Sequence, residues 1–223
     1  MMLDRYASDP AMRATTFVVL DFEGITPTAA PAEPIEVGAV LLHLHDSPRG
    51  WRLGETGRFE SLIRPPAHAP VTVFDARQTG ITPAMLADRP DAATALGELD
   101  ATLTAPPYVT VAHHAATEAG ILRRYTTACR ILATAPMLDT IRLARHSCPG
   151  LPNYQLDTIL THLGITIPAG RHRALPDAAA TAAAFRHLLT VGSVRLAWSR
   201  LSQLHAIAGA APPHQPDDQQ PLF

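Results

Sequence analysis

The sequence predicts an α/β fold with a mixed β-sheet, three antiparallel strands followed by parallel strands, flanked by helices. Three strand-like runs joined by short links come first along the chain. Helical and strand-like patterns then alternate, and the last third of the chain is mainly helical in pattern. This order is typical of domains in which helices cover a mixed sheet.

The expected strands are short runs rich in β-branched and other apolar residues, bounded by polar or proline-containing segments. The first covers residues 17–20 and leads into an acidic segment. Residues 35–43 and 51–63 are expected to form the second and third strands. Later strands are expected at 108–112 and 137–138.

The expected helices begin at suitable capping residues. Pro83 fits the first turn of a short helix. Asp91 is a suitable N-cap for a helix that runs to about Leu103. Further helical patterns are expected at about 116–130, 139–146, 153–163, 177–190 and 193–207.

A chain of 223 residues is long enough for one domain with extensions. We expect a flexible N-terminal arm over residues 1–15, a folded domain over 16–207 and a disordered, proline-rich tail over 208–223. The most apolar run, residues 37–44, is too short to span a bilayer. The N-terminal segment carries no apolar run of signal-peptide length, so we expect a soluble cytoplasmic protein with no membrane contact.

Composition limits the classes of function. Hydrophobic residues make up 47% of the chain and charged residues 17%, which is typical of a globular domain. The formal net charge is −2, whereas a protein that coats duplex nucleic acid is usually basic. Two cysteines without a CxxC pair exclude a disulfide scaffold and fit a reducing cytoplasm. Any contact with nucleic acid is therefore expected to be local, in a cleft that holds one strand end.

Two carboxylates follow the first predicted strand. Asp21 and Glu23 are two residues apart, so their side chains point to the same face of an extended strand. Two acids on one face repel each other unless a cation lies between them, and Mg²⁺ or Mn²⁺ suits carboxylate oxygens. An isolated pair of this kind is more often two exposed acids at a strand end, and that alternative stays open at this point.

A second cluster joins a loop histidine to a helix start. Asp177 is expected to begin a helix directly after Pro176, and His172 lies in the preceding loop. A loop imidazole could act as a general base while the helix holds the carboxylate in place. A capping aspartate beside a surface histidine explains the same residues equally well.

A third cluster follows the strand expected at 108–112. His113 and His114 precede Glu118, which falls early in the next predicted helix. A glutamate in a first turn is commonly placed there by the helix dipole alone. His114 and Glu118 are also spaced i, i+4, but the zinc motif H-E-x-x-H is missing and no third ligand is indicated.

Taken in order, these clusters resemble the motifs of the DEDD exonuclease superfamily in its DEDDh branch, which includes the epsilon proofreading subunit of bacterial replicases and ribonuclease T. The resemblance runs from about Phe17 to Leu189 and includes an intact H-x-A-x-x-D signature. The matching blocks are FVVLDFEG with PIEVGAV, GITPAML, VAHHAATEAGIL, MLDTIRLAR, LPNYQLDTIL and HRALPDAAATAAAF. The resemblance implies a ribonuclease-H-like fold and a metal-dependent 3′→5′ exonuclease that acts on single-stranded DNA ends and releases nucleoside 5′-monophosphates.

The resemblance also implies roles for individual residues. Asp21, Glu23 and Asp177 would bind a first Mg²⁺ or Mn²⁺ ion, and Asp21 with Glu118 would hold a second. His172 would be the general base for the attacking water. Two ions can stabilise both the attacking and the leaving oxygens at phosphorus.

The chain departs from the family pattern around Glu118, where the family usually has aspartate. The family also favours asparagine at His114 and an aromatic residue near Thr117. Glutamate keeps the charge but is longer by one methylene, and metal sites tolerate little slack in geometry. Two alternatives therefore remain, an RNA-trimming exoribonuclease and a weakly catalytic nucleic-acid-binding module of the same fold.

The resemblance further implies substrate contacts. The segment with Phe22, Gly24 and Ile25 would wedge against the terminal base, beside His113 and His114. The alternative that Phe22 is simply a core residue is equally consistent with the sequence. Ribonuclease T-like relatives form dimers, so a homodimer is a further expectation to test.

The last five residues, Q-Q-P-L-F, resemble the short peptide by which bacterial replication and repair proteins dock on the sliding clamp. Leu222 and Phe223 would enter an apolar groove, and Gln219 would form a hydrogen bond at its rim. An arbitrary polar tail explains so short a pattern about equally well.

Overall fold

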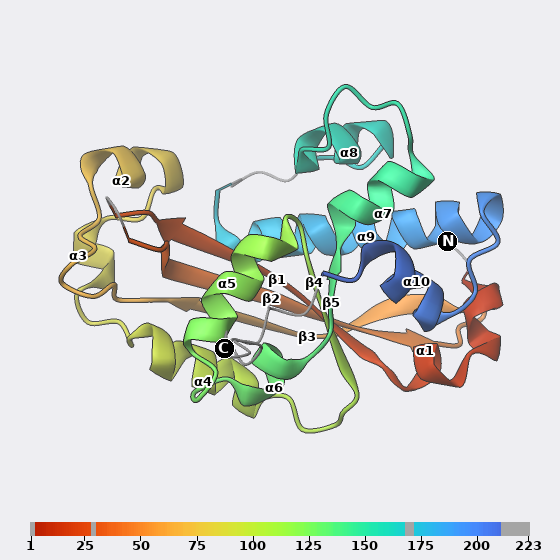
Figure 1. The fold of residues 1–223 in the computed structure, drawn as a ribbon, viewed down its shortest axis with the longest axis horizontal. Coiled ribbons are helices and arrows are strands. Elements are labelled where there is room, and N and C mark those ends of the chain that lie inside the picture. The colour runs from red at the N-terminus through yellow and green to blue at the C-terminus, as the bar shows by residue number, and fades with distance from the viewer. Residues whose placement is uncertain (1–2, 28–29, 168–171, 211–223) are drawn as a thin grey trace, which may run out of the picture.

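The computed structural model contains one mixed sheet with helices on both faces (Figure 1). It describes residues 3–27, 30–167 and 172–210. The five strands lie in the order β3-β2-β1-β4-β5. Their bounds are Thr16–Ile25 for β1, Glu33–His45 for β2, Arg52–Leu62 for β3, Tyr108–Ala112 for β4 and Met137–Asp139 for β5.

The strand directions confirm the predicted fold class. The strands β1, β2 and β3 form an antiparallel meander, and β4 and β5 extend the sheet in parallel with β1. The helices are η1 (a 3-10 helix, Asp4–Ser8), α1 (Pro10–Ala14), α2 (Val73–Thr79), α3 (Pro83–Leu86), α4 (Ala92–Ala101), α5 (Ala115–Arg124), α6 (Arg130–Thr134), α7 (Thr140–Ser147), α8 (Leu156–His162), α9 (Ala174–Arg195) and α10 (Leu201–Ala208).

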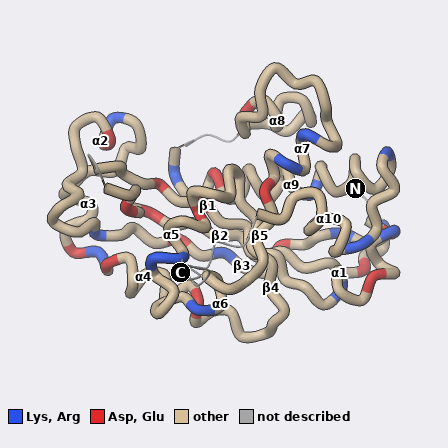
Figure 2. Tube along the Cα trace, in the orientation of Figure 1, with Lys and Arg blue, Asp and Glu red and all other residues tan. Residues whose placement is uncertain are grey.

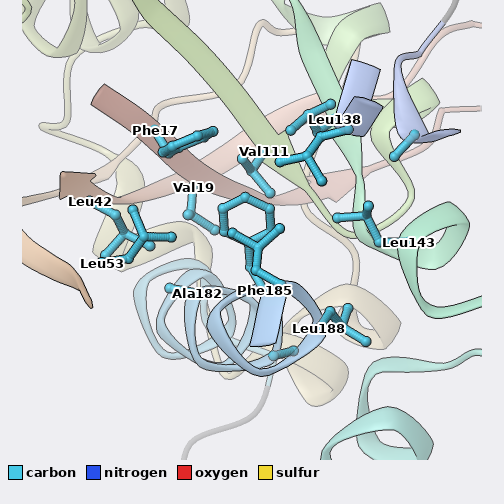
Figure 3. Packing of buried hydrophobic residues seen from close by; sticks show 14 of the residues in the cluster. Phe17, Val19, Leu42, Leu53, Val111, Leu138, Leu143, Ala182, Phe185 and Leu188 are labelled. Atoms are coloured by element: carbon cyan, nitrogen blue, oxygen red, sulfur yellow. The ribbon is translucent and has the colours of Figure 1, made fainter. Parts of the chain in front are cut away.

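Alternation along β1 divides the core between the two faces of the sheet. Phe17 and Val19 point to the face covered by α7, α9 and α10. Val18 and Leu20 point to the opposite face, which α4, α5 and α6 cover. The ring centroids of Phe185, from α9, and Phe17 lie 5.3 Å apart. Figure 3 shows side chains of α9 packed against this face of the sheet. By the same alternation, Asp21 and Glu23 lie on the α9 face.

The expectation of a flexible arm over residues 1–15 is wrong for its described part. This segment forms η1 and α1, and it buries Leu3, Tyr6 and Met12 in the main core cluster. The carboxylate of Asp9 accepts a hydrogen bond from the backbone nitrogen of Leu201 at 2.7 Å. Burial of these three apolar side chains offsets the entropy of ordering the segment.

Several helix boundaries differ from expectation. The pattern expected at 116–130 divides into α5 and α6, and α9 extends to Arg195, so that α10 is shorter than predicted. Helix α2 was not predicted, although Thr72 and Asp75 form a capping box at its start.

The C-terminal tail expected from residue 208 onward is described only at its beginning. Ala208 ends α10, and the backbone nitrogen of Ala210 donates to the carbonyl of Met137 at 2.9 Å. Gln219, Leu222 and Phe223 lie outside the described residues, so the clamp motif stays a prediction. Among the helices of the described chain, none combines the length and apolar character needed to cross a bilayer.

Candidate active site

Asp21 and Glu23 lie within β1 itself, because this strand continues past the predicted end at residue 20. Asp21 pairs with Gly38 of β2, and Glu23 pairs with Glu36. The register between β1 and β2 shifts directly after Glu23. Such irregularities are common beside active sites, where they change the direction of a side chain.

Asp177 comes to the same place from the start of α9. The helix begins at Ala174, earlier than the predicted start at Asp177. Pro176 lies in the first turn, where a backbone N–H group has no partner within the helix, so proline is tolerated there. Asp177 is 7% exposed. Its Oδ2 atom accepts a hydrogen bond from the backbone nitrogen of His172 at 3.3 Å.

Gly38 allows α9 to approach the sheet closely enough for this convergence. A Cβ atom added at Gly38 would lie 2.3 Å from the backbone nitrogen of Leu175, in the first turn of α9. Contacts this short do not occur for real Cβ atoms, so any larger residue would move the helix. The absence of a side chain at this position therefore sets the distance between Asp177 and Asp21.

Glu36 and Arg173 fasten the same helix end to β2. The Arg173 Nε atom donates to both carboxylate oxygens of Glu36, at 3.0 and 2.9 Å, and the backbone nitrogen of Ala174 donates to Oε2 at 2.8 Å. Glu36 is fully buried. The hydrogen bonds to Glu36 raise the pKa of Arg173, with smaller contributions from the Glu60 and Glu23 carboxylates. Arg173 thus also offsets part of the negative charge around Glu23.

The structure brings together three of the four predicted metal-binding acids. One carboxylate oxygen each from Asp21, Glu23 and Asp177 lie within 4.8 Å of one another. Three hard oxygen donors at this spacing suit a divalent cation such as Mg²⁺ or Mn²⁺. The donor set therefore fits the implied cofactor.

Glu118 does not join this set among the described residues. It lies in the first turn of α5 and is 5% exposed. Burial raises its pKa to about 8, and the nearby carboxylate of Asp139 adds to the rise. Its Oε2 atom has no hydrogen-bond partner within the described part of the chain.

The predicted histidines surround the acids at different depths. His172 adopts a left-handed backbone conformation, its side chain is exposed, and its backbone nitrogen donates to Asp177 of the acidic set. His113 is half-buried, with Nδ1 2.9 Å from the Thr140 hydroxyl. His114 is exposed, and its Nδ1 atom lies 3.1 Å from the Thr117 hydroxyl.

The segment expected to wedge against a base divides into exposed and buried residues. Gly24 is exposed, and Phe22 is half-buried against the core on the α4 side of the sheet. Ile25 is 3% exposed and packs with Ile35 and Ile81. It therefore offers almost no surface to a ligand, which argues against the predicted contact for this residue.

A cleft of about 410 Å³ opens beside the acids. Its lining includes Asp21, Asp177, His113, His114, Arg145 and Tyr154. Arg145 and Tyr154 are not among the residues predicted from the sequence, although both lie in blocks that resemble the family. The Glu36–Arg173 pair was not predicted either, and the available signal was a charged residue within the apolar run PIEVGAV.

Comparison with known proteins agrees with this geometry. The family model of RNase_T, described as exonuclease, matches residues 18–185. The PolC-type DNA polymerase III of Oceanobacillus iheyensis is 33% identical over 175 residues, which cover 78% of this chain and 11% of that protein. This chain thus spans about a tenth of the PolC-type relative.

A relative of similar length is the DNA polymerase III subunit epsilon of Aquifex aeolicus. It is 31% identical over 175 residues, which cover 78% of this chain and 80% of that protein. Among solved structures, the nuclease domain of 3′hExo, a DEDDh family member bound to rAMP, superposes with a TM-score of 0.64 at 19% identity. The match covers 84% of this chain and 94% of that one, and at this identity it shows a shared fold.

Proposed function

Because the chain belongs to the RNase_T exonuclease family, in its DEDDh branch, we propose that it hydrolyses single-stranded DNA from the 3′ end with Mg²⁺ or Mn²⁺ as cofactor. The products are nucleoside 5′-monophosphates and a strand shortened by one residue. The observation that carries this proposal is the convergence of Asp21, Glu23 and Asp177 within 4.8 Å. A cleft beside them is open to a strand end.

Asp21, Glu23 and Asp177 would hold the first cation. Bound divalent cations neutralise phosphate charge and lower the pKa of an attacking water. The buried position of Asp177 and its hydrogen bond from His172 fix one ligand, while the partly exposed Asp21 and Glu23 face the cleft side of the sheet. Such fixed ligands favour a defined geometry at the scissile phosphate.

His172 is the proposed general base. As water attacks phosphorus, its proton passes to the imidazole, the bond from phosphorus to the 3′ oxygen breaks, and that oxygen takes a proton from solvent. The backbone nitrogen of His172 donates to Asp177, and in the proposed reaction the exposed imidazole would turn toward the acids. An imidazole suits proton transfer at neutral pH.

Glu118 and Asp21 would share a second cation. Support for this finer proposal comes from the Glu118 Oε2 atom, which is buried without a hydrogen-bond partner among the described residues. A cation nearby would favour the ionised carboxylate and reverse the effect of burial. Glu118 is not part of the acidic set of the described residues, and this favours a second candidate function, weak catalysis by a nucleic-acid-binding module.

DNA is the proposed substrate because the relatives with substantial sequence identity are parts of DNA polymerase III. RNA trimming remains the alternative, since the similar solved nuclease domain is bound to rAMP. Rates on DNA and RNA single strands of matched sequence and length distinguish the two.

A 5′-labelled single-stranded oligonucleotide tests the proposal. With Mg²⁺ or Mn²⁺ we expect a ladder of progressively shorter labelled fragments, and with EDTA an intact strand. Asp21→Asn should abolish the ladder, while Asp46→Asn, which alters an exposed acid outside the acidic set, should leave it unchanged. Early release of a labelled mononucleotide would contradict the polarity, and an unchanged Asp21→Asn rate would contradict the site. Slow cleavage with tight binding would favour the weakly catalytic alternative.

We also propose that the Q-x-x-L-F ending binds the sliding clamp through Leu222 and Phe223, with Gln219 at the groove rim. The epsilon and PolC-type relatives are named as DNA polymerase III proteins, which supports a replication or repair setting. A homodimer is the remaining partner proposal, and light scattering of the full chain tests it.

A further inference from the structure

Arg145 is a cation in the cleft that contains the acids. It lies on α7, and its side chain lines this cleft together with Asp21 and Asp177. Figure 2 shows basic positions on α7 next to α8, whereas acidic positions occur along the strands. The cleft therefore carries both signs of charge, with negative charge at the proposed cation site and positive charge on the α7 wall.

The guanidinium of Arg145 has no carboxylate partner among the described residues. Its side chain is exposed and lies over the ring of Tyr154, 5.5 Å from the ring centroid. A cation above an aromatic face is held in position while its N–H groups remain available at the edge of the guanidinium. Arg145 is thus oriented without being neutralised.

Tyr154 is itself fixed. Its hydroxyl donates to the carbonyl of Cys148 at 3.4 Å, and its ring is half-buried against the main core cluster. A support fixed in this way lowers the entropy lost when Arg145 binds a ligand. The chemistry that matches a planar guanidinium fork is a phosphate or carboxylate group.

We propose that Arg145 binds a backbone phosphate of the substrate strand other than the phosphate that is hydrolysed, and that Tyr154 positions Arg145 for this contact. The inference rests on the proposed function, because the same cleft holds the strand. Arg145 lines the same cleft as Asp21 and Asp177, so a strand whose terminal phosphodiester reaches these acids would bring a neighbouring phosphate to the α7 wall. The site therefore selects polynucleotides over single nucleotide esters.

Two substrates test this contact separately from the chemistry. The nitrophenyl ester of thymidine 5′-monophosphate has only the scissile phosphate, whereas a single-stranded oligonucleotide has several. Arg145→Ala should raise KM for the oligonucleotide about 5- to 20-fold and leave turnover of the ester unchanged. For the oligonucleotide, the plot of log affinity against log salt concentration should have a slope shallower by about 0.7 in Arg145→Ala than in the wild type. This difference is the contribution of one phosphate contact to a single strand.

Matched variants control for stability and for the role of Tyr154. Arg142 lies on the same helix as Arg145, but its guanidinium donates to the carbonyl of Gly209. Arg142→Ala should therefore leave KM and turnover unchanged for both substrates. Tyr154→Phe keeps the ring and should retain wild-type salt dependence, while Tyr154→Leu should lose part of it. Equal losses on both substrates, or no loss on either, would overturn the proposal.

Failure of the proposed function gives a different result. If the wild-type chain cleaves neither substrate, the exonuclease proposal is wrong. The Arg145 contact is then judged by oligonucleotide binding with Ca²⁺ present. A wild-type affinity for Arg145→Ala in that measurement would overturn the contact, and an affinity about 5-fold weaker or more would support it.

Discussion

Arg173 and Glu36 form a bidentate ion pair that links the residue before α9 to the middle of the sheet, 137 residues apart along the chain. Glu36 lies directly across from Glu23 in the β1–β2 pairing. Like charges opposite each other destabilise a sheet unless a cation compensates them. The pair therefore serves two purposes, since it holds the helix that carries Asp177 and moderates the charge near the acidic set.

Removal of the Glu36 charge is expected to destabilise the fold and the site together. Glu36→Gln leaves Arg173 without its main partner, and because the Arg173 side chain is 34% exposed to solvent, we expect a cost of about 2 kcal/mol, below that of breaking a fully buried pair. Urea unfolding measures the change. Glu60→Gln is the matched control, because Glu60 lies 3.7 Å from Arg173 at the surface and should cost less than about 1 kcal/mol. Equal effects of the two variants would contradict this account.

A side chain at Gly38 should displace α9. Gly38→Ala is expected to lower the free energy of unfolding by about 1–3 kcal/mol and to reduce exonuclease turnover at least 10-fold, because Asp177 moves with the helix. Gly57→Ala, whose Cβ would lie 3.8 Å from the Leu41 side chain, should remain near wild type in both measurements. A fully active Gly38→Ala variant would show that the close approach is not required.

The buried carboxyl of Glu118 predicts a pH dependence of stability without metal. Its pKa rises from 4.5 to about 8 in the folded chain. Between these values folding takes up a proton, so the free energy of unfolding falls as the pH rises through this window. Each pKa unit corresponds to about 1.4 kcal/mol, which makes the loss a few kcal/mol.

Thermal unfolding in EDTA between pH 5 and pH 8 measures this pH dependence of stability. The upper limit corresponds to the pKa of Glu118 in the folded chain. Glu118→Gln should flatten the profile, because the amide does not titrate. Mn²⁺ should also restore stability at the upper end of the range if Glu118 helps to bind a cation. Identical slopes for wild type and Glu118→Gln would mean that another group causes the pH dependence.

Deletion of Leu222 and Phe223 should abolish binding to a bacterial sliding clamp without changing the exonuclease rate on free oligonucleotides. The reason is that these two residues supply the apolar part of the Q-x-x-L-F peptide. Surface plasmon resonance measures the clamp affinity of the full chain and of the deletion variant. Asp217→Asn and Asp218→Asn serve as charge controls in the same tail. Unchanged clamp affinity of the deletion variant would refute the motif.

Local patterns predicted those parts of the site that depend on local geometry. The period of a strand placed Asp21 and Glu23 on one face, and Asp91 caps its helix as expected. Contacts between distant segments were not predictable in this way. The approach of α9 at Gly38 and the Glu36–Arg173 pair depend on how two elements pack.

The same limit explains the errors. Tyr6 and Met12 were assigned to a flexible arm because short helices give weak sequence patterns. Their burial depends on contacts with distant segments of the main core cluster, which a local pattern does not reveal. Glu118 could be assigned to a helix start, but its depth beneath the surface depends on how α5 packs. The sequence pattern therefore could not tell whether its carboxylate would reach the other acids.

The central claim is that Asp21, Glu23 and Asp177 hold a divalent cation, and titration of the full chain with Mn²⁺ tests it most directly. Calorimetry should detect saturable Mn²⁺ binding by the wild-type chain and by Asp46→Asn, and at least 10-fold weaker binding by a folded Asp177→Asn variant. Circular dichroism establishes that the variant is folded. Undiminished Mn²⁺ affinity in folded Asp177→Asn would contradict the account.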